Sequence, residues 1–287
     1  KQLETVKIVT SGAGAAAISS LNLLVTLGVP IANIVITDRN GVVYAGREGR
    51  IDASKKVYEQ ETTDRTLADA LKGADVFLGM SGPGVMDADM VRSMAAKPLV
   101  FALANPNPEI DPAVAFAARD DVIMATGRSD YPNQVNNVLC FPYLFRGALD
   151  CGATTINEEM KRATVYAIAD LAMAESSEVV ADAYQGEKLA FGPEYLIPKP
   201  FDPRLILEIA PAVAKAAMDS GVAKRPIKDF AAYRLQLERF VYKSGMTMKP
   251  VFEQAQTDPK RVVYAEGEDR RVLRAVQVLI DDGVCMP

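Results

Sequence analysis

The sequence has 287 residues, of which 49% are hydrophobic and 24% charged, a composition typical of an ordinary globular protein. The formal net charge of −5 without a lysine- and arginine-dense stripe does not favour a nucleic-acid partner, and no apolar run reaches the roughly 18 residues of a membrane span. The absence of histidine excludes Ser-His-Asp and Cys-His nucleophiles and histidine-based metal sites.

Short β-branched runs alternate with helical patterns through about residue 150. Near-continuous apolar runs predict strands at 6–10, 33–37, 75–79, 98–103 and 122–126. Helical patterns predict helices at about 15–27, 62–72, 87–95, 112–118 and 137–150. This alternation predicts a doubly wound α/β domain over residues 1–150, with a parallel, Rossmann-like sheet.

Residues 151–245 carry no strand pattern and are predicted to be a helical segment. Asn157 can cap the first helix of this segment. Asp202-Pro203 is a start signal for a later helix, which then meets Pro211, where we expect a kink or a break. A further helix is expected in KDFAAYRLQLERFVYKSG.

The pattern changes again at residues 246–287. This stretch predicts a helix, the strand RVVYAEG and another helix, after which the helical pattern ends. One strand cannot form a sheet alone. We therefore expect this stretch to be the truncated start of another α/β domain, namely its first strand-helix unit.

A glycine tip joins the first predicted strand to the first helix in VKIVTSGAGAAAISSLNLLVTLG. Gly12 allows a tight turn, and Gly14 lets the backbone approach a pyrophosphate. Peptide N–H groups at the positive end of the helix would point at phosphate oxygens, and they belong to Ala13, Gly14, Ala15 and Ala16. A plain turn between a strand and a helix is the alternative.

The second predicted strand ends in Asp38, 24 residues after Gly14, near the spacing at which an acid meets the adenosine ribose hydroxyls. Arg39 follows and can pair with a 2′-phosphate, which the carboxylate of Asp38 would repel. Asp38 thus favours NAD and Arg39 permits NADP, so both cofactors stay open.

The remaining strand tips are also polar or glycine-rich, in GMSGPG (79–84), ALANPNPE (102–109) and ATGRSDYPNQVNN (125–137). In a doubly wound sheet these tips share the carboxyl edge, where ligands bind. Asparagine side chains there offer neutral donors and acceptors for a carboxamide or a substrate carboxylate. The candidate contacts are Ser81, Gly82, Asn105, Asn136 and Asn137, and a cofactor site is favoured over plain turns.

Several of these segments resemble a known family. IVTSGAGAAA, ANPNPEI and NQVNNVLCFPYLFRGALD resemble the nucleotide-binding domain of malic enzyme in its bacterial hybrid form. KRVVYAEGEDRRVLRA resembles the opening of the phosphotransacetylase-like domain fused behind malic enzyme in those hybrids. The resemblance implies oxidative decarboxylation of (S)-malate to pyruvate and carbon dioxide, with reduction of a nicotinamide cofactor and with Mg²⁺ or Mn²⁺ as Lewis acid.

The resemblance also implies site roles by position. Ala13 to Ala16 would cradle the pyrophosphate, and Asp38-Arg39 would sit at the adenosine ribose. Asn105 and Asn137 would lie beside nicotinamide and malate. The hybrids mostly use NADP, which makes NADP the expected cofactor and NAD the alternative.

Catalytic residues and metal ligands are expected to lie outside this chain. Family members carry a catalytic lysine, a tyrosine and acidic metal ligands in a domain that precedes the nucleotide-binding fold. Here Asp87 and Asp89 resemble helix-capping acids, and Asp281-Asp282 sits beside a helix-ending glycine. Lys199 and Tyr131 are not favoured as acid–base groups, so the chain should bind nucleotide and turn nothing over.

Two other functions are compatible with the sequence. One is a regulatory module that senses a dinucleotide or acyl-CoA without chemistry. The other is a different two-domain dehydrogenase, such as an amino-acid dehydrogenase, against which the NQVNN segment argues.

Other features of the sequence bear on partners and location. Alanine-rich helices after residue 155 could bury against a second copy in a homo-oligomer, and the resemblance implies acetyl-CoA regulation through the C-terminal domain. The odd number of cysteines, three, and a start unlike a signal peptide make the cytoplasm the expected location.

Overall fold

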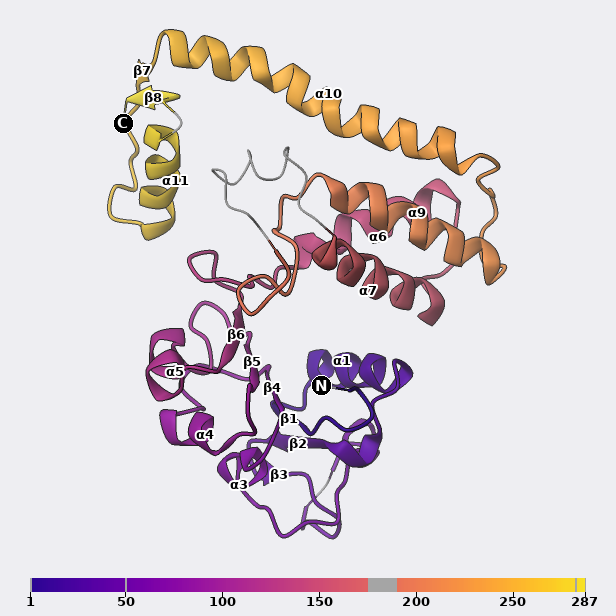
Figure 1. Ribbon diagram of the computed structural model, residues 1–287, viewed down its shortest axis with the longest axis vertical. Helices are drawn as coiled ribbons and strands as arrows, with labels where there is room; N and C mark the ends of the chain where they lie inside the picture. Colours follow the sequence, from indigo (N-terminus) through magenta and orange to yellow (C-terminus); the bar gives the residue numbers. More distant parts are fainter. Residues whose placement is uncertain (1, 50, 175–189, 282, 287) are drawn as a thin grey trace. The chain divides into compact units, whose positions relative to one another are not determined.

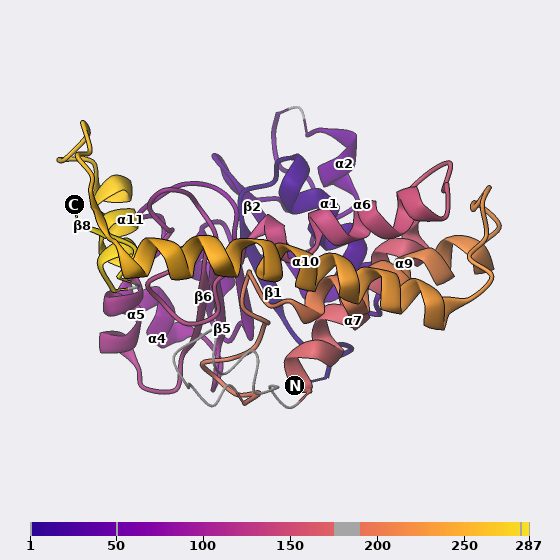
Figure 2. The ribbon, with the colours of Figure 1, turned by 90° about the horizontal axis from the view of Figure 1, so that it is seen from above.

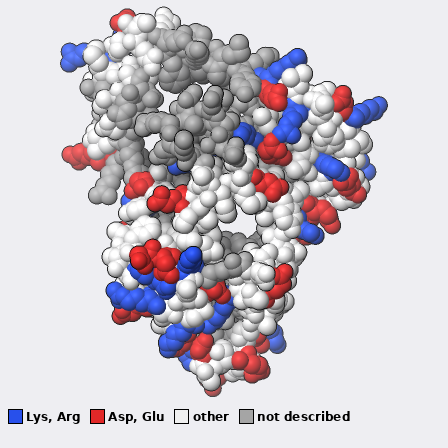
Figure 3. Space-filling view, in the orientation of Figure 1, with Lys and Arg blue, Asp and Glu red and all other residues white. Residues whose placement is uncertain are grey.

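The computed structural model describes residues 2–49, 51–174, 190–281 and 283–286 (Figure 1). The chain divides into two compact units, Lys1–Ile227 and Lys228–Pro287. No helix among the described residues is both long and apolar enough to cross a bilayer. On the face drawn in Figure 3, lysine and arginine side chains are interspersed with aspartates and glutamates.

A six-stranded sheet organises the first unit, with the order β3-β2-β1-β4-β5-β6. The strands are β1 (Ile8–Ser11), β2 (Ile34–Asp38), β3 (Gly41–Val42), β4 (Val76–Gly79), β5 (Leu99–Ala102) and β6 (Ile123–Thr126). All pairs are parallel except β2 with β3, so the five predicted strands and the doubly wound fold are confirmed. Because the order runs outward from β1 in both directions, the crevice lies at the carboxyl ends of β1 and β4.

Helices cover both faces of this sheet. They are α1 (Ala15–Thr26), α2 (Ala53–Lys56), α3 (Leu67–Leu71), α4 (Ala88–Ser93) and α5 (Pro112–Ala118), with the 3₁₀ turn η1 (Ile31–Asn33). Alternate strand residues such as Val9 and Phe77 pack with buried side chains of α3, α4 and α5. Residues of the opposite face, such as Ile8 and Ile36, pack with α1. The sheet is therefore apolar on both faces, which explains the near-continuous apolar runs of its strands.

The helical segment of the first unit begins with η2 (Asn137–Leu139) and continues with α6 (Phe141–Asp150), α7 (Glu158–Met173) and α9 (Arg204–Asp219). Helix α9 packs against both α6 and α7. The cap predicted at Asn157 is confirmed, because its side chain accepts a hydrogen bond from the Met160 N–H at 3.1 Å.

Of the kink or break expected at Pro211, the break is wrong, because α9 continues through this residue. Proline has no N–H to donate to the preceding turn, which removes one helical hydrogen bond. Helix α9 buries Leu205, Ile209 and Val213 completely, and burial of each side chain of this size stabilises by about 1.5–3 kcal/mol. Packing of this apolar face outweighs the missing bond.

The second unit contains α10 (Phe230–Thr257), β7 (Lys260–Arg261), α11 (Arg270–Asp281) and β8 (Cys285–Met286). Figure 2 shows α10 as one uninterrupted helix where the sequence predicted two. The strand predicted in RVVYAEG is wrong beyond Arg261, although the Val262 N–H still donates to the Met286 carbonyl at 2.9 Å. Its ladder is short because its described partner, the parallel strand β8, has two residues.

Candidate functional site

A pocket of about 740 Å³ opens at the carboxyl ends of β1, β2 and β4. This volume lies within the range of small-molecule sites. Six of the predicted cofactor contacts line it, namely Gly12, Ala13, Gly14, Asp38, Arg39 and Ser81. The other lining residues are Ser11, Thr37, Asn40, Arg47, Lys55, Leu67, Met80 and Val85.

Gly12 brings the tips of β1 and β4 into close contact. Its φ of +96° is in the region that favours glycine, and a Cβ built on it would lie 2.4 Å from the Met80 carbonyl oxygen. The hydroxyls of Ser11 and Ser81 are hydrogen-bonded across the same two tips at 2.8 Å. The tips therefore form one fixed wall of the pocket.

Gly14 faces open space at the start of α1. A Cβ built on Gly14 would meet no atom within 4 Å, and no side chain caps the N-terminus of this 12-residue helix. Ala15 and Ala16, in the first turn, are exposed beside the pocket rather than part of its lining. Backbone N–H groups at the positive end of a helix attract an anion, so this arrangement fits a phosphate group.

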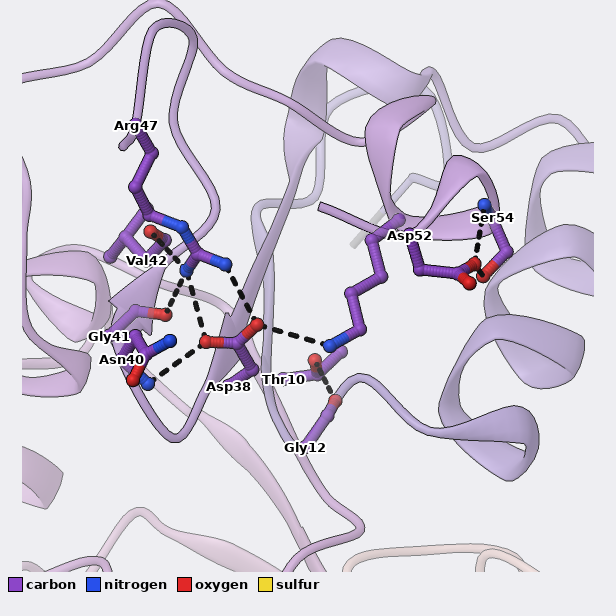
Figure 4. Close-up of polar contacts among 10 residues, drawn as sticks. Thr10, Gly12, Asp38, Asn40, Gly41, Val42, Arg47, Asp52 and Ser54 are labelled. Atoms are coloured by element: carbon purple, nitrogen blue, oxygen red, sulfur yellow. Dashed lines mark hydrogen bonds and ion pairs between the residues drawn. The ribbon is translucent and has the colours of Figure 1, made fainter. Parts of the chain in front are cut away.

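Asp38 is held by two basic side chains (Figure 4). Arg47 donates to both carboxylate oxygens at 3.0 and 2.9 Å, Lys55 donates at 3.1 Å, and the Asn40 N–H donates at 3.0 Å. Burial by itself would raise the pKa of Asp38, but the hydrogen bonds from Arg47, Asn40 and Lys55 outweigh it and hold that pKa well below its usual range.

Arg47 and Lys55 were not among the predicted site residues. Both come from the segment after β3, which returns to the carboxyl end of β2, a tertiary placement that strand-end signals do not reveal. The basic content of residues 47–56 was the available signal. With Arg39 they give the pocket three basic side chains against the carboxylate of Asp38, an excess of two positive charges.

The remaining predicted contacts lie outside this pocket. Gly82 follows Ser81 but is not part of the lining, and Asn105, at the β5 tip, is exposed. Asn137 is exposed at the start of η2. Asn136 stabilises a turn, since its side-chain oxygen accepts a hydrogen bond from the Val138 N–H at 3.1 Å.

The polar residues considered as metal ligands or acid–base groups include two with structural contacts. Asp87 caps α4 by accepting the Met90 N–H at 2.9 Å, as predicted. Tyr131 lies under the Arg128 guanidinium, 5.0 Å from the ring centroid. The second residue of Asp281-Asp282 lies outside the described residues. Within the described ranges, no three His, Cys, Asp or Glu side chains are grouped to hold a metal ion.

Comparison with known proteins identifies the family. Residues 1–182 match the family described as malic enzyme, NAD binding domain. The chain belongs to the malic enzyme family. Residues 246–287 match the family described as phosphate acetyl/butaryl transferase, which confirms the resemblance of the C-terminal segment.

Two bacterial malic enzymes match along the whole chain. It is 62% identical to the NAD-dependent malic enzyme of Rhizobium meliloti (strain 1021), covering 100% of this chain and 37% of that protein. It is 61% identical to the NADP-dependent malic enzyme of Salmonella typhimurium, covering 100% of this chain and 38% of that protein. The chain thus spans less than two fifths of the length of these relatives. Their names do not favour the two alternative functions, a regulatory sensing module and a different two-domain dehydrogenase.

Solved malic enzyme structures share the fold. The malic enzyme of Entamoeba histolytica superposes with a TM-score of 0.76 at 29% identity, covering 99% of this chain and 56% of that one. The malic enzyme of Pyrococcus horikoshii superposes with a TM-score of 0.69 at 32% identity, covering 88% of this chain and 56% of that one. The doubly wound fold predicted for the malic enzyme segment is therefore shared by both.

Proposed function

We propose that the pocket binds the nicotinamide cofactor of a malic enzyme and that the N-terminus of α1 holds its pyrophosphate. The observation that carries this proposal is the open space at Gly14 beside an uncapped helix N-terminus in the pocket. Gly12, Ala13, Ser81 and Gly82 would flank the pyrophosphate from the tips of β1 and β4. When bound, the cofactor would supply the hydride acceptor for oxidation of the substrate.

NADP is the proposed cofactor, with NAD as the alternative. The Asp38 carboxylate already accepts hydrogen bonds from Arg47 and Lys55, so it is less free to bind ribose hydroxyls. The excess of positive charge in the pocket favours a 2′-phosphate. The relatives include enzymes named for each cofactor, so the choice rests on these side chains.

Arg39→Ala should weaken NADP⁺ binding by about tenfold and NAD⁺ binding by less than twofold, because only NADP⁺ carries the 2′-phosphate that a guanidinium can pair with. Titration of both nucleotides into the variant measures the difference. Arg92→Ala, which alters an exposed arginine of α4, is the control. An equal loss for both nucleotides would remove Arg39 from the 2′-phosphate site.

The whole protein that contains this chain is proposed to convert malate to pyruvate and carbon dioxide. Asn105 and Asn137 would orient malate and the nicotinamide through neutral amide hydrogen bonds. The acid–base groups and the ligands of Mg²⁺ or Mn²⁺ would come from a part of the protein outside this chain. Support comes from the family match and from the relatives' names.

We propose that the domain organisation, oligomeric state, regulation and location of the protein match those of the bacterial hybrid malic enzymes. The nucleotide-binding domain would span residues 1–150, the helical segment 151–245 and the phosphotransacetylase-like start 246–287, the last supported by its family match. We also propose a homo-oligomer, acetyl-CoA regulation through the C-terminal domain, and a cytoplasmic location. The three unpaired cysteines are compatible with that location.

One experiment separates binding from turnover. The 287-residue chain should bind NADP⁺ but should not reduce it when malate and Mg²⁺ are added, because a base and metal ligands are needed for decarboxylation. Absorbance at the reduced nicotinamide band measures turnover. Malate-dependent reduction by this chain alone would place the catalytic groups within it and contradict the proposal.

A further inference from the structure

Glu109 is a fully buried acidic side chain outside the pocket described above. It lies between β5 and α5 and has 0% exposure. Burying a carboxyl group costs free energy unless hydrogen bonds compensate for the lost water. A carboxyl group buried at this position therefore needs hydrogen-bond partners.

Glu109 joins the tips of two neighbouring strands. One carboxyl oxygen accepts the Ser81 N–H at 2.9 Å, just after β4, and the other accepts the Ala104 N–H at 3.0 Å, just after β5. The Glu109 carbonyl also accepts the Met86 N–H at 3.1 Å. A single side chain thus fixes the spacing of the two tips.

The last residue of β4 leaves room for this side chain. A Cβ built on Gly79 would lie 2.5 Å from the Glu109 carboxyl carbon, so the carboxyl group fits because position 79 has no side chain. Asn105 directly follows Ala104, and its Oδ1 would be 2.7 Å from a Cβ built on Gly127, just after β6. The anchoring by Glu109 therefore extends from the β4 tip through the β5 tip to Asn105 beside the β6 tip.

The two halves of the sheet differ in what they would bind. A doubly wound dinucleotide fold consists of two mononucleotide-binding halves that meet at the crevice. Asp38, Arg39, Arg47 and Lys55 belong to the β1–β3 half, together with the glycine tip. Glu109 belongs to the β4–β6 half, which would receive the nicotinamide mononucleotide.

We propose that Glu109 is a positioning residue for the nicotinamide half of the cofactor site, an inference that rests on the proposed dinucleotide function. It acts through others: its hydrogen bonds hold Ser81 and Ala104, and through Ala104 they place Asn105. Glutamine at this position offers one acceptor oxygen and turns an NH₂ donor toward the second backbone N–H. One strand tip is then released, while the hydrogen bonds of Asp38 with Arg47 and Lys55 in the β1–β3 half do not involve Glu109 and stay in place.

Calorimetric titration of the 287-residue chain with NADP⁺ and with 2′,5′-ADP, which contains only the adenosine half, tests this proposal. Glu109→Gln should weaken NADP⁺ binding roughly tenfold and change 2′,5′-ADP binding by less than about twofold. Glu159→Gln, at an exposed position of α7, is the matched control and should leave both affinities unchanged.

A second variant keeps the test decisive if glutamine prevents folding. Glu109→Asp retains both oxygens on an arm one methylene shorter and should give the same selective loss at smaller magnitude. Equal weakening of both ligands in the folded variants, or unchanged NADP⁺ affinity, would overturn the positioning role. Failure of the unmodified chain to bind NADP⁺ would instead contradict the proposed function, so the two failures are distinguishable.

Discussion

The Gly14→Val chain should fold almost as stably as the unmodified chain and lose at least about a hundredfold in dinucleotide affinity. The backbone at Gly14 is extended, with φ −84°, and a Cβ there meets no atom within 4 Å. The change should therefore cost at most about 1 kcal/mol of stability through the poorer N-cap. Binding fails because the branched side chain enters the space where phosphate oxygens would accept several backbone N–H hydrogen bonds.

Gly12→Ala is the matched comparison for this prediction, since it alters the neighbouring glycine of the same tip. Its Cβ would lie 2.4 Å from the Met80 carbonyl oxygen at a φ of +96°, so the fold should lose about 2 kcal/mol or more. Thermal unfolding and NADP⁺ titration of both variants separate stability from binding. A folded Gly14→Val chain that binds NADP⁺ as tightly as the unmodified chain would refute the phosphate site.

Arg47→Ala should lower the free energy of unfolding by about 2–3 kcal/mol at pH 7, since it removes charged hydrogen bonds from a largely buried ion pair. The Arg47 and Asp38 side chains are 8% and 13% exposed. Arg47 also donates to the Val42 carbonyl at 3.1 Å, so its loss leaves a backbone acceptor without this donor. Urea-induced unfolding of the variant measures the change.

The effect of Arg47→Ala should depend on pH in one direction. The pKa of Asp38 is lower in the folded chain than the value near 4 of an unfolded aspartate, so the ion pair stabilises fully above about pH 4. Its contribution is lost as the pH falls below 4 through the depressed folded pKa. The difference between the two chains should therefore shrink in acid, leaving the part due to the Val42 carbonyl.

Arg92→Ala is the control for this ion pair, because Arg92 and Asp89 form an exposed pair with side chains 54% and 91% exposed. Exposed pairs contribute about 0–1 kcal/mol, so this variant should unfold nearly as the unmodified chain does. A loss for Arg47→Ala that stays constant on acidification past the depressed pKa of Asp38 would show that Asp38 is not the partner that matters.

The sequence predicts the parallel strands well because both faces of the sheet are covered. The runs at residues 33–37 and 75–79 are apolar over 34–36 and 76–78, and each of these apolar stretches lies in a strand. The glycine tip is equally visible, since Gly12 and Gly14 are adjacent to the strand and helix that they join. These features depend on local sequence, which a pattern can report.

The features that the sequence did not predict depend on contacts between segments that are distant in the chain. The contacts of Asp38 with Arg47 and Lys55 arise from the return of the chain after β3, a two-residue strand too short to have a pattern. Pro211 was expected to kink or break its helix, and tertiary packing keeps α9 continuous through it. Glu109 reads as an ordinary acid after a proline, and its role emerges only when the tips of β4 and β5 are brought together.

The most direct test of a dinucleotide site at the glycine tip is calorimetric titration of the unmodified chain with NADP⁺ and, separately, with NAD⁺. Both nucleotides should bind, and NADP⁺ more tightly, because Arg39, Arg47 and Lys55 outnumber the single carboxylate of Asp38. The absence of heat of binding for either nucleotide, with a chain shown to be folded, would contradict a dinucleotide site at this tip.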